Sequence, residues 1–340
     1  MSRRNVRTWL LVLLAILLPV AALLAICAGK YSVTPGESLH ILLSAITGRD
    51  SGADTMTVNV VLGLRLPRIL ASILVGAALS VSGASYQGMF QNPLVSPDLL
   101  GVTSGACVGA AAAILLSLSG SGIQLLAFLG GLAAVALTMA LPLLLGSRSN
   151  LMLVLSGIIV GSAMSSLLGF LKYTADPETE LAAITYWTMG SFRYIELKDL
   201  LPLLPVLLLP MAALWLLAFP MDVLTLGEWD ARSLGISVRA VRSAVILCAT
   251  LLTAASVCLA GTVGWVGLTI PHLCRMLMGP GHRRLLPASA LLGGLFLLVV
   301  DTLTRTIGVE EMPISILTGL VGAPFYGWLL WYQRRERHDL

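Results

Sequence analysis

The sequence carries little charge for its length. Of its 340 residues, only 11% are Asp, Glu, Lys or Arg, whereas 57% are hydrophobic. Soluble domains usually contain about a quarter charged residues, because their surfaces must be solvated. The scarcity of charge excludes an ordinary water-soluble globule. In lipid the backbone must satisfy its own hydrogen bonds, so we predict an all-α polytopic membrane protein.

The sequence also lacks the usual motifs of enzymes and metalloproteins. Its four histidines are scattered, with no HExxH, GxSxG or GxxxxGK[ST] pattern. Its five cysteines form no CxxC pair, which argues against a zinc site or a disulfide framework. We therefore predict that the chain is not an enzyme and binds no cofactor or metal, and that any ATP hydrolysis must belong to another chain. The net charge of +4 does not predict nucleic-acid binding.

Long apolar runs are abundant, and a run of about 20 residues can cross a bilayer as a helix. Two weaker candidates are residues 101–118, which are rich in small side chains, and 261–278, which contain Pro271, His272 and Arg275. With these, we predict about ten spans. The clearer runs are residues 9–27, 69–88, 123–145, 151–171, 200–218, 244–260, 285–300 and 314–331.

Basic residues gather in the segments that a ten-span count places on one side of the membrane. Basic loops remain on the cytoplasmic side, so both termini are predicted to be cytoplasmic. The first apolar run follows arginines as a signal peptide does, but it continues for a full span, which predicts a retained helix. The arginines that set this orientation are Arg3, Arg4, Arg7, Arg148, Arg232, Arg239, Arg242, Arg283, Arg284, Arg334, Arg335 and Arg337.

Three polar breaks lie where water or partner proteins can reach the chain. Residues 29–67 are predicted to lie outside, and the helical apolar spacing at 31–47 predicts a short helix on the outer surface. Residues 91–98 read QNPLVSPD, and the two prolines predict a rigid inner turn. Residues 220–242 form the longest inner polar segment, which Gly227 and Gly235 should divide into two short helices.

Two arginines flank Pro67 in the segment LRLPR, at the predicted outer mouth of the second span. Pro67 suits the first turn of a helix, so Arg65 and Arg68 should be fixed at the external surface. Guanidinium groups suit bidentate capture of carboxylates on a docking protein. Snorkelling to lipid phosphates is the alternative. The spacing of Asp301 and Arg305 predicts either a surface ion pair or an outward-facing Arg305.

Glu228, Asp230 and Arg232 lie in the longest inner segment. Short amphipathic helices there could insert into a groove on a cytosolic partner. A solvated loop with ordinary surface charges is the alternative.

The run GTVGWVGLTIPHLCR at 261–275 predicts a discontinuous helix. We place the break at Gly267, Pro271 and His272, because Pro271 removes a backbone donor. Such a break is tolerated at membrane depth only where protein or a water-filled cavity surrounds it. A capping or interhelix role for His272 is favoured over catalysis.

Taken in their shared order and spacing, several segments resemble the FecCD-type permease family of ABC importers, which includes cobalamin and ferric-siderophore permeases. The resemblance covers nearly the whole chain. Its segments are LRLPRILASILVGAALSVSGASYQGMFQNPLVSPDLLGVTSGA at 64–106, YWTMGSF at 186–192, ARSLGISVRAVR at 231–242, AGTVGWVGLTIPHLCR at 260–275, HRRLLPASALLGG and DTLTR within 282–305, and EEMPISILTGLVGAPFYGWLL at 310–330.

The resemblance implies a type II ABC importer permease architecture, with residues 1–340 forming a single transmembrane permease domain in the bacterial cell (inner) membrane. It implies a second permease subunit, either identical or a paralogue, around a central pathway. It also implies two cytosolic ABC ATPase subunits and an external or periplasmic substrate-binding protein.

The resemblance also assigns roles to individual positions. Arg65, Arg68 and Arg305 match the outer arginines that such permeases present to acidic residues of the binding protein. Residues 227–242 match the helices that couple such permeases to the ATPase. The turn between spans two and three matches a cytoplasmic gate of the family. The coupling residues are Gly227, Glu228, Asp230, Arg232, Leu234 and Gly235, and the cytoplasmic gate residues are Asn92, Pro93 and Leu94, with Asn150 and Leu151 near a second gate.

The cargo remains open at this stage, because such permeases enclose bulky chelates in a weakly interacting channel and specificity resides in the binding protein. A ferric siderophore or similar metal chelate is the first choice, and cobalamin, haem or molybdate are the alternatives. Two other classes stay in view: an intramembrane enzyme using His272 with a hydroxyl such as that of Thr269, and a purely structural or signalling membrane component.

Overall fold

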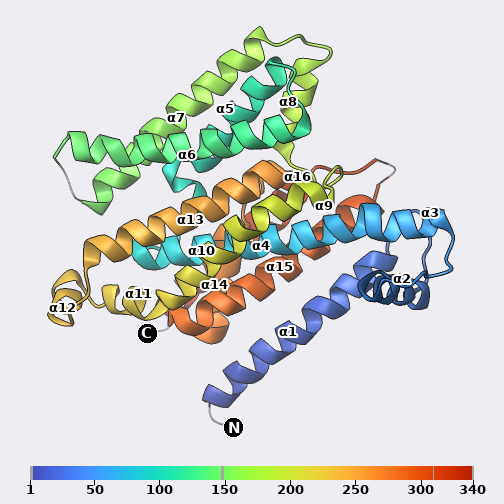
Figure 1. Ribbon diagram of the computed structural model, residues 1–340. Helices are drawn as coiled ribbons and strands as arrows, with labels where there is room; N and C mark the ends of the chain where they lie inside the picture. The colour runs from blue at the N-terminus through green and yellow to red at the C-terminus, as the bar shows by residue number, and fades with distance from the viewer. Residues whose placement is uncertain (1–2, 147–148, 309, 339–340) are drawn as a thin grey trace.

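The computed structural model describes residues 3–146, 149–308 and 310–338, and within them the chain forms helices and no strand (Figure 1). Arg148 lies outside the described residues, as do the side chains of Arg3, Arg4, Asn150, Arg334, Arg335 and Arg337. The longer elements are α1 (Arg3–Cys27), α4 (Leu66–Met89), α5 (Val102–Leu115), α6 (Gly120–Leu144), α7 (Asn150–Thr174), α10 (Leu204–Leu216), α13 (Val238–Ala260), α14 (Val266–Met278), α15 (His282–Thr306) and α16 (Ile314–His338). The shorter ones are α2 (Pro35–Thr47), α3 (Thr55–Val58), η1 (Asn59–Arg65), η2 (Pro97–Leu100), α8 (Glu180–Met189), α9 (Leu197–Leu200), η3 (Leu201–Leu203), α11 (Ala218–Leu224) and α12 (Glu228–Ser233).

The described part of the chain contains seven helical segments that are long and apolar enough to cross a membrane. Three shorter apolar helices, at 102–115, 266–278 and 314–328, bring the set to ten. The prediction of an all-α polytopic membrane protein with about ten spans is confirmed. The number of apolar residues per helix explains the result, because each of the seven reaches the length that a bilayer core requires.

The long helices give the molecule two ends (Figure 1). We call the end that carries α2 and the loop between α15 and α16 the α2 end. The opposite end, which carries α12, is the α12 end. Because successive spans alternate in direction and their number is even, the start of α1 and the end of α16 both lie at the α12 end.

Helix α4 occupies the centre of the bundle and packs against α13, α14 and α15. Glycines permit its closest approaches. A Cβ atom at Gly76 would lie 2.2 Å from the Gly293 carbonyl oxygen on α15, and one at Gly83 would lie 1.8 Å from the Gly267 carbonyl oxygen on α14. Hydroxyl groups add hydrogen bonds to α13, for example between Ser82 and the Thr253 hydroxyl at 2.9 Å. Small side chains and hydroxyl pairs are the means by which helices associate in lipid.

The helix that contains α4 begins earlier than the sequence indicates. Segment η1 is a π-helix that joins α3 to α4, so the helical chain runs from Thr55 to Met89. Helical structure therefore begins within residues 29–67, before the predicted start of the second span, whereas Pro67 itself lies in the first turn of α4, as predicted. Pro67 cannot donate a backbone hydrogen bond, and the wider π-turn before it relieves the clash with the carbonyl four residues earlier.

The helix break also lies elsewhere than predicted. Gly267, Pro271 and His272 are all inside the continuous helix α14, and the break occupies residues 261–265. There Gly261 and Trp265 adopt φ angles of 69° and 70°, which cannot continue a right-handed helix. Pro271 removes only the hydrogen bond to the Gly267 carbonyl. That carbonyl instead packs against the Cα of Gly83, where no side chain obstructs it.

A short helix is present where the apolar spacing at 31–47 predicts one. Helix α2 begins with a capping box, in which the Thr34 hydroxyl accepts from the Glu37 amide and the Glu37 carboxylate accepts from the Thr34 amide at 3.0 Å. These hydrogen bonds lower the pKa of Glu37. Gly48, in a left-handed conformation, ends the helix. Ile41 is buried and Ile46 is exposed, so the helix has one face against the protein and one face away from it.

Candidate functional site

A cavity of about 870 Å³ opens at the α2 end. We call it the cationic recess, because its lining carries five cationic side chains and only two carboxylates. The exposed rings of Tyr186 and Tyr194 lie at its margin. The ionisable residues that line it are Lys30, Arg65, Arg68, Arg193, Arg305, Glu310 and Glu311.

Arg65 lies at the end of the π-helical segment η1, which directs its side chain toward the end of α1. Its Nη1 donates to the Ile26 carbonyl at 2.6 Å, and its Nη2 donates to the Tyr31 carbonyl at 2.5 Å. Gly29 makes room for this contact, because a Cβ there would lie 2.6 Å from Nη2. The guanidinium group is thus fixed without a carboxylate partner among these contacts, and its charge remains directed at the recess.

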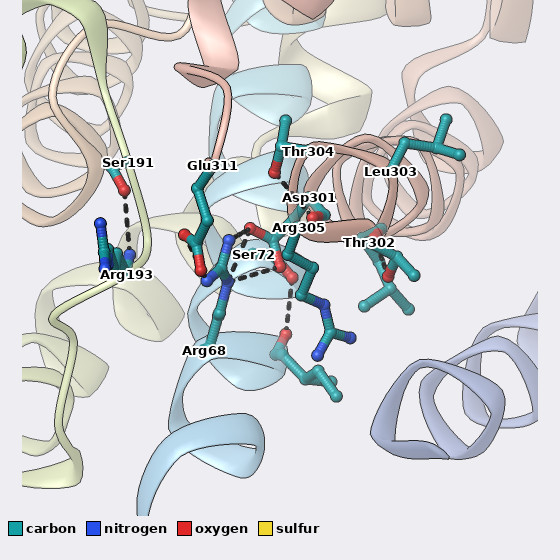
Figure 2. Close-up of polar contacts among 12 residues, drawn as sticks. Arg68, Ser72, Ser191, Arg193, Asp301, Thr302, Leu303, Thr304, Arg305 and Glu311 are labelled. Atoms are coloured by element: carbon teal, nitrogen blue, oxygen red, sulfur yellow. Dashed lines mark hydrogen bonds and ion pairs between the residues drawn. The ribbon is translucent and has the colours of Figure 1, made fainter. Parts of the chain in front are cut away.

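Arg68 lies one turn further along and binds two carboxylates (Figure 2). Its Nε donates to both oxygens of Asp301 at 2.9 and 3.0 Å, and its Nη2 donates to Asp301 Oδ1 at 2.8 Å. Its Nη1 donates to Glu311 Oε2 at 2.9 Å. The Asp301 side chain is 0% exposed, so this fork is a buried, charge-assisted ion pair between α4 and α15.

Arg305 extends from α15 toward α1, where its Nη2 donates to the Ala25 carbonyl. The predicted surface ion pair between Asp301 and Arg305 is therefore wrong. Asp301 is fully buried and is used by Arg68, which reaches both of its oxygens. Arg65, Arg68 and Arg305 are only 6%, 7% and 7% exposed. They form the wall of a recess rather than an open surface patch.

The α12 end carries the predicted coupling segment. Gly227 (φ 132°) separates α11 from α12, and Gly235 (φ 78°) follows α12, so two short helices are present where the glycines predict them. Ala231 is fully buried and anchors α12 to the bundle. Trp229 on the same helix is 86% exposed, and Leu234 just after it is 63% exposed.

The charges of this segment are paired with one another at the surface. Glu228 accepts from Arg232 at 3.1 Å and from Arg242 at 2.8 Å. The Glu228 side chain is 44% exposed. Asp230 lies in the first turn of α12, where a carboxylate is favoured by the helix dipole. The segment therefore presents a short helix with a fixed pattern of charge around an exposed indole ring.

The predicted gate turn follows α4 at the α12 end. The Asn92 side chain accepts from the Leu94 amide at 2.9 Å, and Leu94 is 57% exposed. Tyr326 on α16 donates from its hydroxyl to the Pro93 carbonyl at 3.4 Å. At the second predicted gate position, α7 begins at Asn150, whose side chain is outside the described residues, and Leu151 is 69% exposed.

Two contacts at this end were not anticipated from the sequence. Gln91 Nε2 donates to the carbonyls of Leu224 and Thr225 at 3.1 and 3.3 Å, which ties the gate turn to the end of α11. His282 Nδ1 lies 2.6 Å from Asp222 Oδ1 and joins α15 to α11. No local pattern predicts these contacts, because the partners are 133, 134 and 60 residues apart in the chain.

Arg193 and Glu311 were also missed at the α2 end. Arg193 lies in the loop between α8 and α9, where its guanidinium stacks 5.3 Å from the centre of the Tyr194 ring. Glu311 lies two residues before Pro313 in a loop that sequence alone marks only as polar. Both residues line the recess from loops, and the direction in which a loop turns cannot be predicted from a periodic sequence pattern.

The described residues form a bundle of ten apolar helices, with a cationic recess at one end and the exposed Trp229 of α12 at the other, which is the architecture of a polytopic membrane protein. Residues 16–332 match the FecCD transport family, and the chain belongs to that family of ABC importer permeases. It is therefore a multi-pass membrane protein. Family membership also confirms the resemblance predicted from the sequence motifs.

Three similar proteins illustrate the breadth of the family. The molybdate import system permease protein MolB of Haemophilus influenzae is 38% identical, with 95% of each chain covered. The vitamin B12 import system permease protein BtuC of Escherichia coli is 39% identical, with 98% of each chain covered. A solved structure described as an inward-facing conformation of a transporter of proposed metal-chelate type has a TM-score of 0.86 and 37% identity, covering 96% of this chain and 99% of that one.

Proposed function

We propose that this chain works with a second permease subunit, two cytosolic ABC ATPases and an external binding protein to import a ferric siderophore or a similar metal chelate. The observation that carries the proposal is the separation of two different surfaces in one FecCD-family chain. The cationic recess lies at the α2 end, and α12 with its exposed Trp229 lies at the α12 end. An importer that receives cargo on one side and ATP energy on the other needs such a separation.

In this proposal the α12 end faces the cytoplasm, together with both termini. The support is the positive-inside rule, because Arg7, Arg232, Arg239, Arg283 and Arg284 all belong to segments of the α12 end. The α2 end then faces outward, or toward the periplasm in a bacterial inner membrane.

The cationic recess would receive acidic residues of the binding protein, with Arg65, Arg68 and Arg305 as the docking charges. The support is chemical. Guanidinium groups remain charged when buried, and three of them are held here at fixed positions around one cavity. Lipid phosphates are a less suitable partner for these side chains, because all three are directed into a recess instead of along the outside of a helix.

At the α12 end, α11 and α12 would insert into a groove on each ATPase, with Trp229 as the apolar anchor and Glu228, Asp230 and Arg232 as the polar rim. Movement of α11 would reach the gate turn through Gln91, which bonds the last residues of that helix. ATP and Mg²⁺ would bind the ATPase, and this chain would bind no cofactor. Each nucleotide state drives transport only by favouring one arrangement of the gate over the other.

The cargo proposal is supported by the similarity to a structure of metal-chelate type. Relatives named for molybdate and vitamin B12 import give the alternatives, and haem is another. These cargoes can be distinguished by comparing uptake in a strain that lacks this chain with uptake in the same strain after the chain is restored. We expect loss of ferric-siderophore uptake on deletion, with uptake of labelled cobalamin and molybdate unchanged.

The architecture itself is tested by purifying the tagged chain from its native membrane in mild detergent and identifying copurifying proteins by mass spectrometry. We expect an ATPase with a Walker motif at about one copy per permease. Its reproducible absence would contradict the proposed complex.

The docking role is tested by the affinity of the binding protein for the complex in nanodiscs. Arg65→Gln, and separately Arg68→Gln with Asp301→Asn, should weaken docking by about tenfold and flatten its salt dependence. The double substitution removes a buried charge together with its buried partner, and the remaining carboxylate, Glu311, is partly exposed and can be solvated. Arg49→Gln, which removes a charge at the same end but outside the recess, is the matched control.

A further inference from the structure

The two carboxylates on Arg68 differ in how easily they can leave. Asp301 is 0% exposed and accepts from two nitrogens of the fork, whereas the Glu311 side chain is 26% exposed and accepts from Nη1 alone. In Figure 2, Glu311 extends from the loop before α16 and contacts Arg68 on the side opposite to Asp301. Asp301 belongs to the body of α15, but Glu311 is held by a loop.

Removing Asp301 from Arg68 would leave a charge buried without a partner, which proteins tolerate poorly. Removing Glu311 has a small cost, because a partly exposed carboxylate can turn into water and be solvated there. A third carboxylate that approached Arg68 would be repelled by both acids. Glu311 is the one that can give way.

We propose that Glu311 occupies, on Arg68, the position that a carboxylate of the external binding protein takes on docking, so that docking displaces Glu311. This inference rests on the docking role given above for the recess. Glu311 is then an internal competitor that keeps Arg68 paired while the binding protein is absent. It is a positioning residue and sets how strongly the recess attracts an acidic partner.

The position of Glu311 in the chain gives the exchange a further consequence. It lies three residues before α16, whose first residue, Ile314, donates its amide to the Gly190 carbonyl at 3.1 Å. Met312 donates to the Thr304 carbonyl at 3.3 Å. These backbone bonds remain when Glu311 leaves, so the change is confined to the Arg68 contact and the short loop that carries Glu311.

The test compares Glu311→Gln with Glu310→Gln in the full complex, reconstituted in nanodiscs with its ATPase. Both changes remove one negative charge from the lining of the same recess. Of these two glutamates, only Glu311 forms an ion pair with Arg68 among the described contacts. Kd for the substrate-loaded binding protein is measured at low and physiological salt. We expect Glu311→Gln to tighten binding by at least about fivefold more than Glu310→Gln, because it removes a competitor as well as a charge. Equal effects of the two variants would overturn the proposal.

A third variant separates this inference from the docking role itself. If Arg68→Gln with Asp301→Asn leaves docking as strong as Arg49→Gln does, the recess is not the docking site and both ideas fail. If that double substitution weakens docking but Glu311→Gln behaves as Glu310→Gln does, only the competitor role fails. In the Arg68→Gln/Asp301→Asn background, Glu311→Gln should no longer tighten binding more than Glu310→Gln does, because the Arg68 guanidinium is absent.

A measurement on the unaltered complex removes any dependence on how the variants fold. A cryo-EM structure of the docked complex should show a binding-protein carboxylate on Arg68 Nη1 and Glu311 turned away from it. Glu311 still bound to Arg68 Nη1 in the docked complex would refute its displacement.

Discussion

The two ends of the molecule use the same residue types in opposite ways. At the α2 end, arginines are drawn into the wall of a cavity and held by buried carbonyls and by Asp301, which is 0% exposed. At the α12 end, Glu228 pairs with Arg232 and Arg242 on the surface, beside a Trp229 that is 86% exposed. Burial fixes the charges at one end in a rigid pattern. Exposure at the other end leaves the indole ring of Trp229 uncovered by the rest of the described chain.

The largest expected effect breaks the buried pair of the α2 end. Asp301→Ala leaves Arg68 with Glu311 alone and should destabilise the protein by about 3–5 kcal/mol, because a buried charge loses its main partner. Thermal unfolding in detergent, followed by size-exclusion chromatography, would measure the loss. Adding Arg68→Leu should recover much of it. A loss below about 1 kcal/mol would mean that the two ends do not differ in the way described.

The second prediction concerns the anchor at the α12 end. Trp229→Ala should leave the stability of the isolated chain unchanged, because the side chain is largely exposed, but should weaken ATPase association by about 2 kcal/mol or more, as for an aromatic hot spot. Copurification and a titration with the purified ATPase provide the measurement. Leu144→Ala is a control, since Leu144 is 82% exposed on α6 and lies outside α11 and α12. If both variants bind equally well, α12 is not the contact.

The third prediction tests the link from α11 to the gate turn. Gln91 has a φ angle of 51°, which glycine adopts without strain, so Gln91→Gly removes the amide and its two hydrogen bonds while keeping the backbone. We expect a loss of about 0.5–1.5 kcal/mol per hydrogen bond in the coupling of the two segments. ATPase association and binding-protein docking should be retained, whereas cargo uptake per ATP hydrolysed should fall. Unchanged transport stoichiometry in proteoliposomes would refute the link.

The smallest effect is expected from the surface ion pairs of the α12 end. Glu228→Gln should change the free energy of unfolding by only about 0.2–1 kcal/mol, and the difference should vanish in high salt. Unfolding curves at low salt and at 1 M salt would test this. A loss as large as that of Asp301→Ala would erase the contrast between the two ends.

Hydropathy was sufficient to predict the spans, because a bilayer imposes a length and a composition that each helix must satisfy alone. Glycine positions were sufficient to predict the two short helices around Gly227, where a local backbone requirement marks the boundary. The sequence did not reveal the helical residues before Pro67, because arginines near a span end look like a boundary when their buried partners are unknown. The break was predicted at Pro271, because a proline signals a break in sequence even where a glycine on a neighbouring helix accommodates the freed carbonyl.

The sequence predicted which residues belong to the candidate sites, but not which residues they contact. The motifs and the family resemblance single out Arg65, Arg68 and Arg305, but their partners at Ile26, Asp301 and Ala25 are 39, 233 and 280 residues away. Contacts over such separations depend on how helices pack, and helix packing depends on faces that composition does not distinguish. The same reason hid Gln91 and Glu311.

The continuity of α4 limits how this chain can change its length during evolution. One unbroken helix carries Arg68 near its start and Gly83 near its end, and Gln91 follows two residues after it. Inserting one residue would rotate everything beyond it by about 100° and shift it by about 1.5 Å. The glycines would then meet the wrong carbonyls, or the recess and the gate turn would lose register with each other. Between these two points substitutions can accumulate, but insertions and deletions should be eliminated by selection.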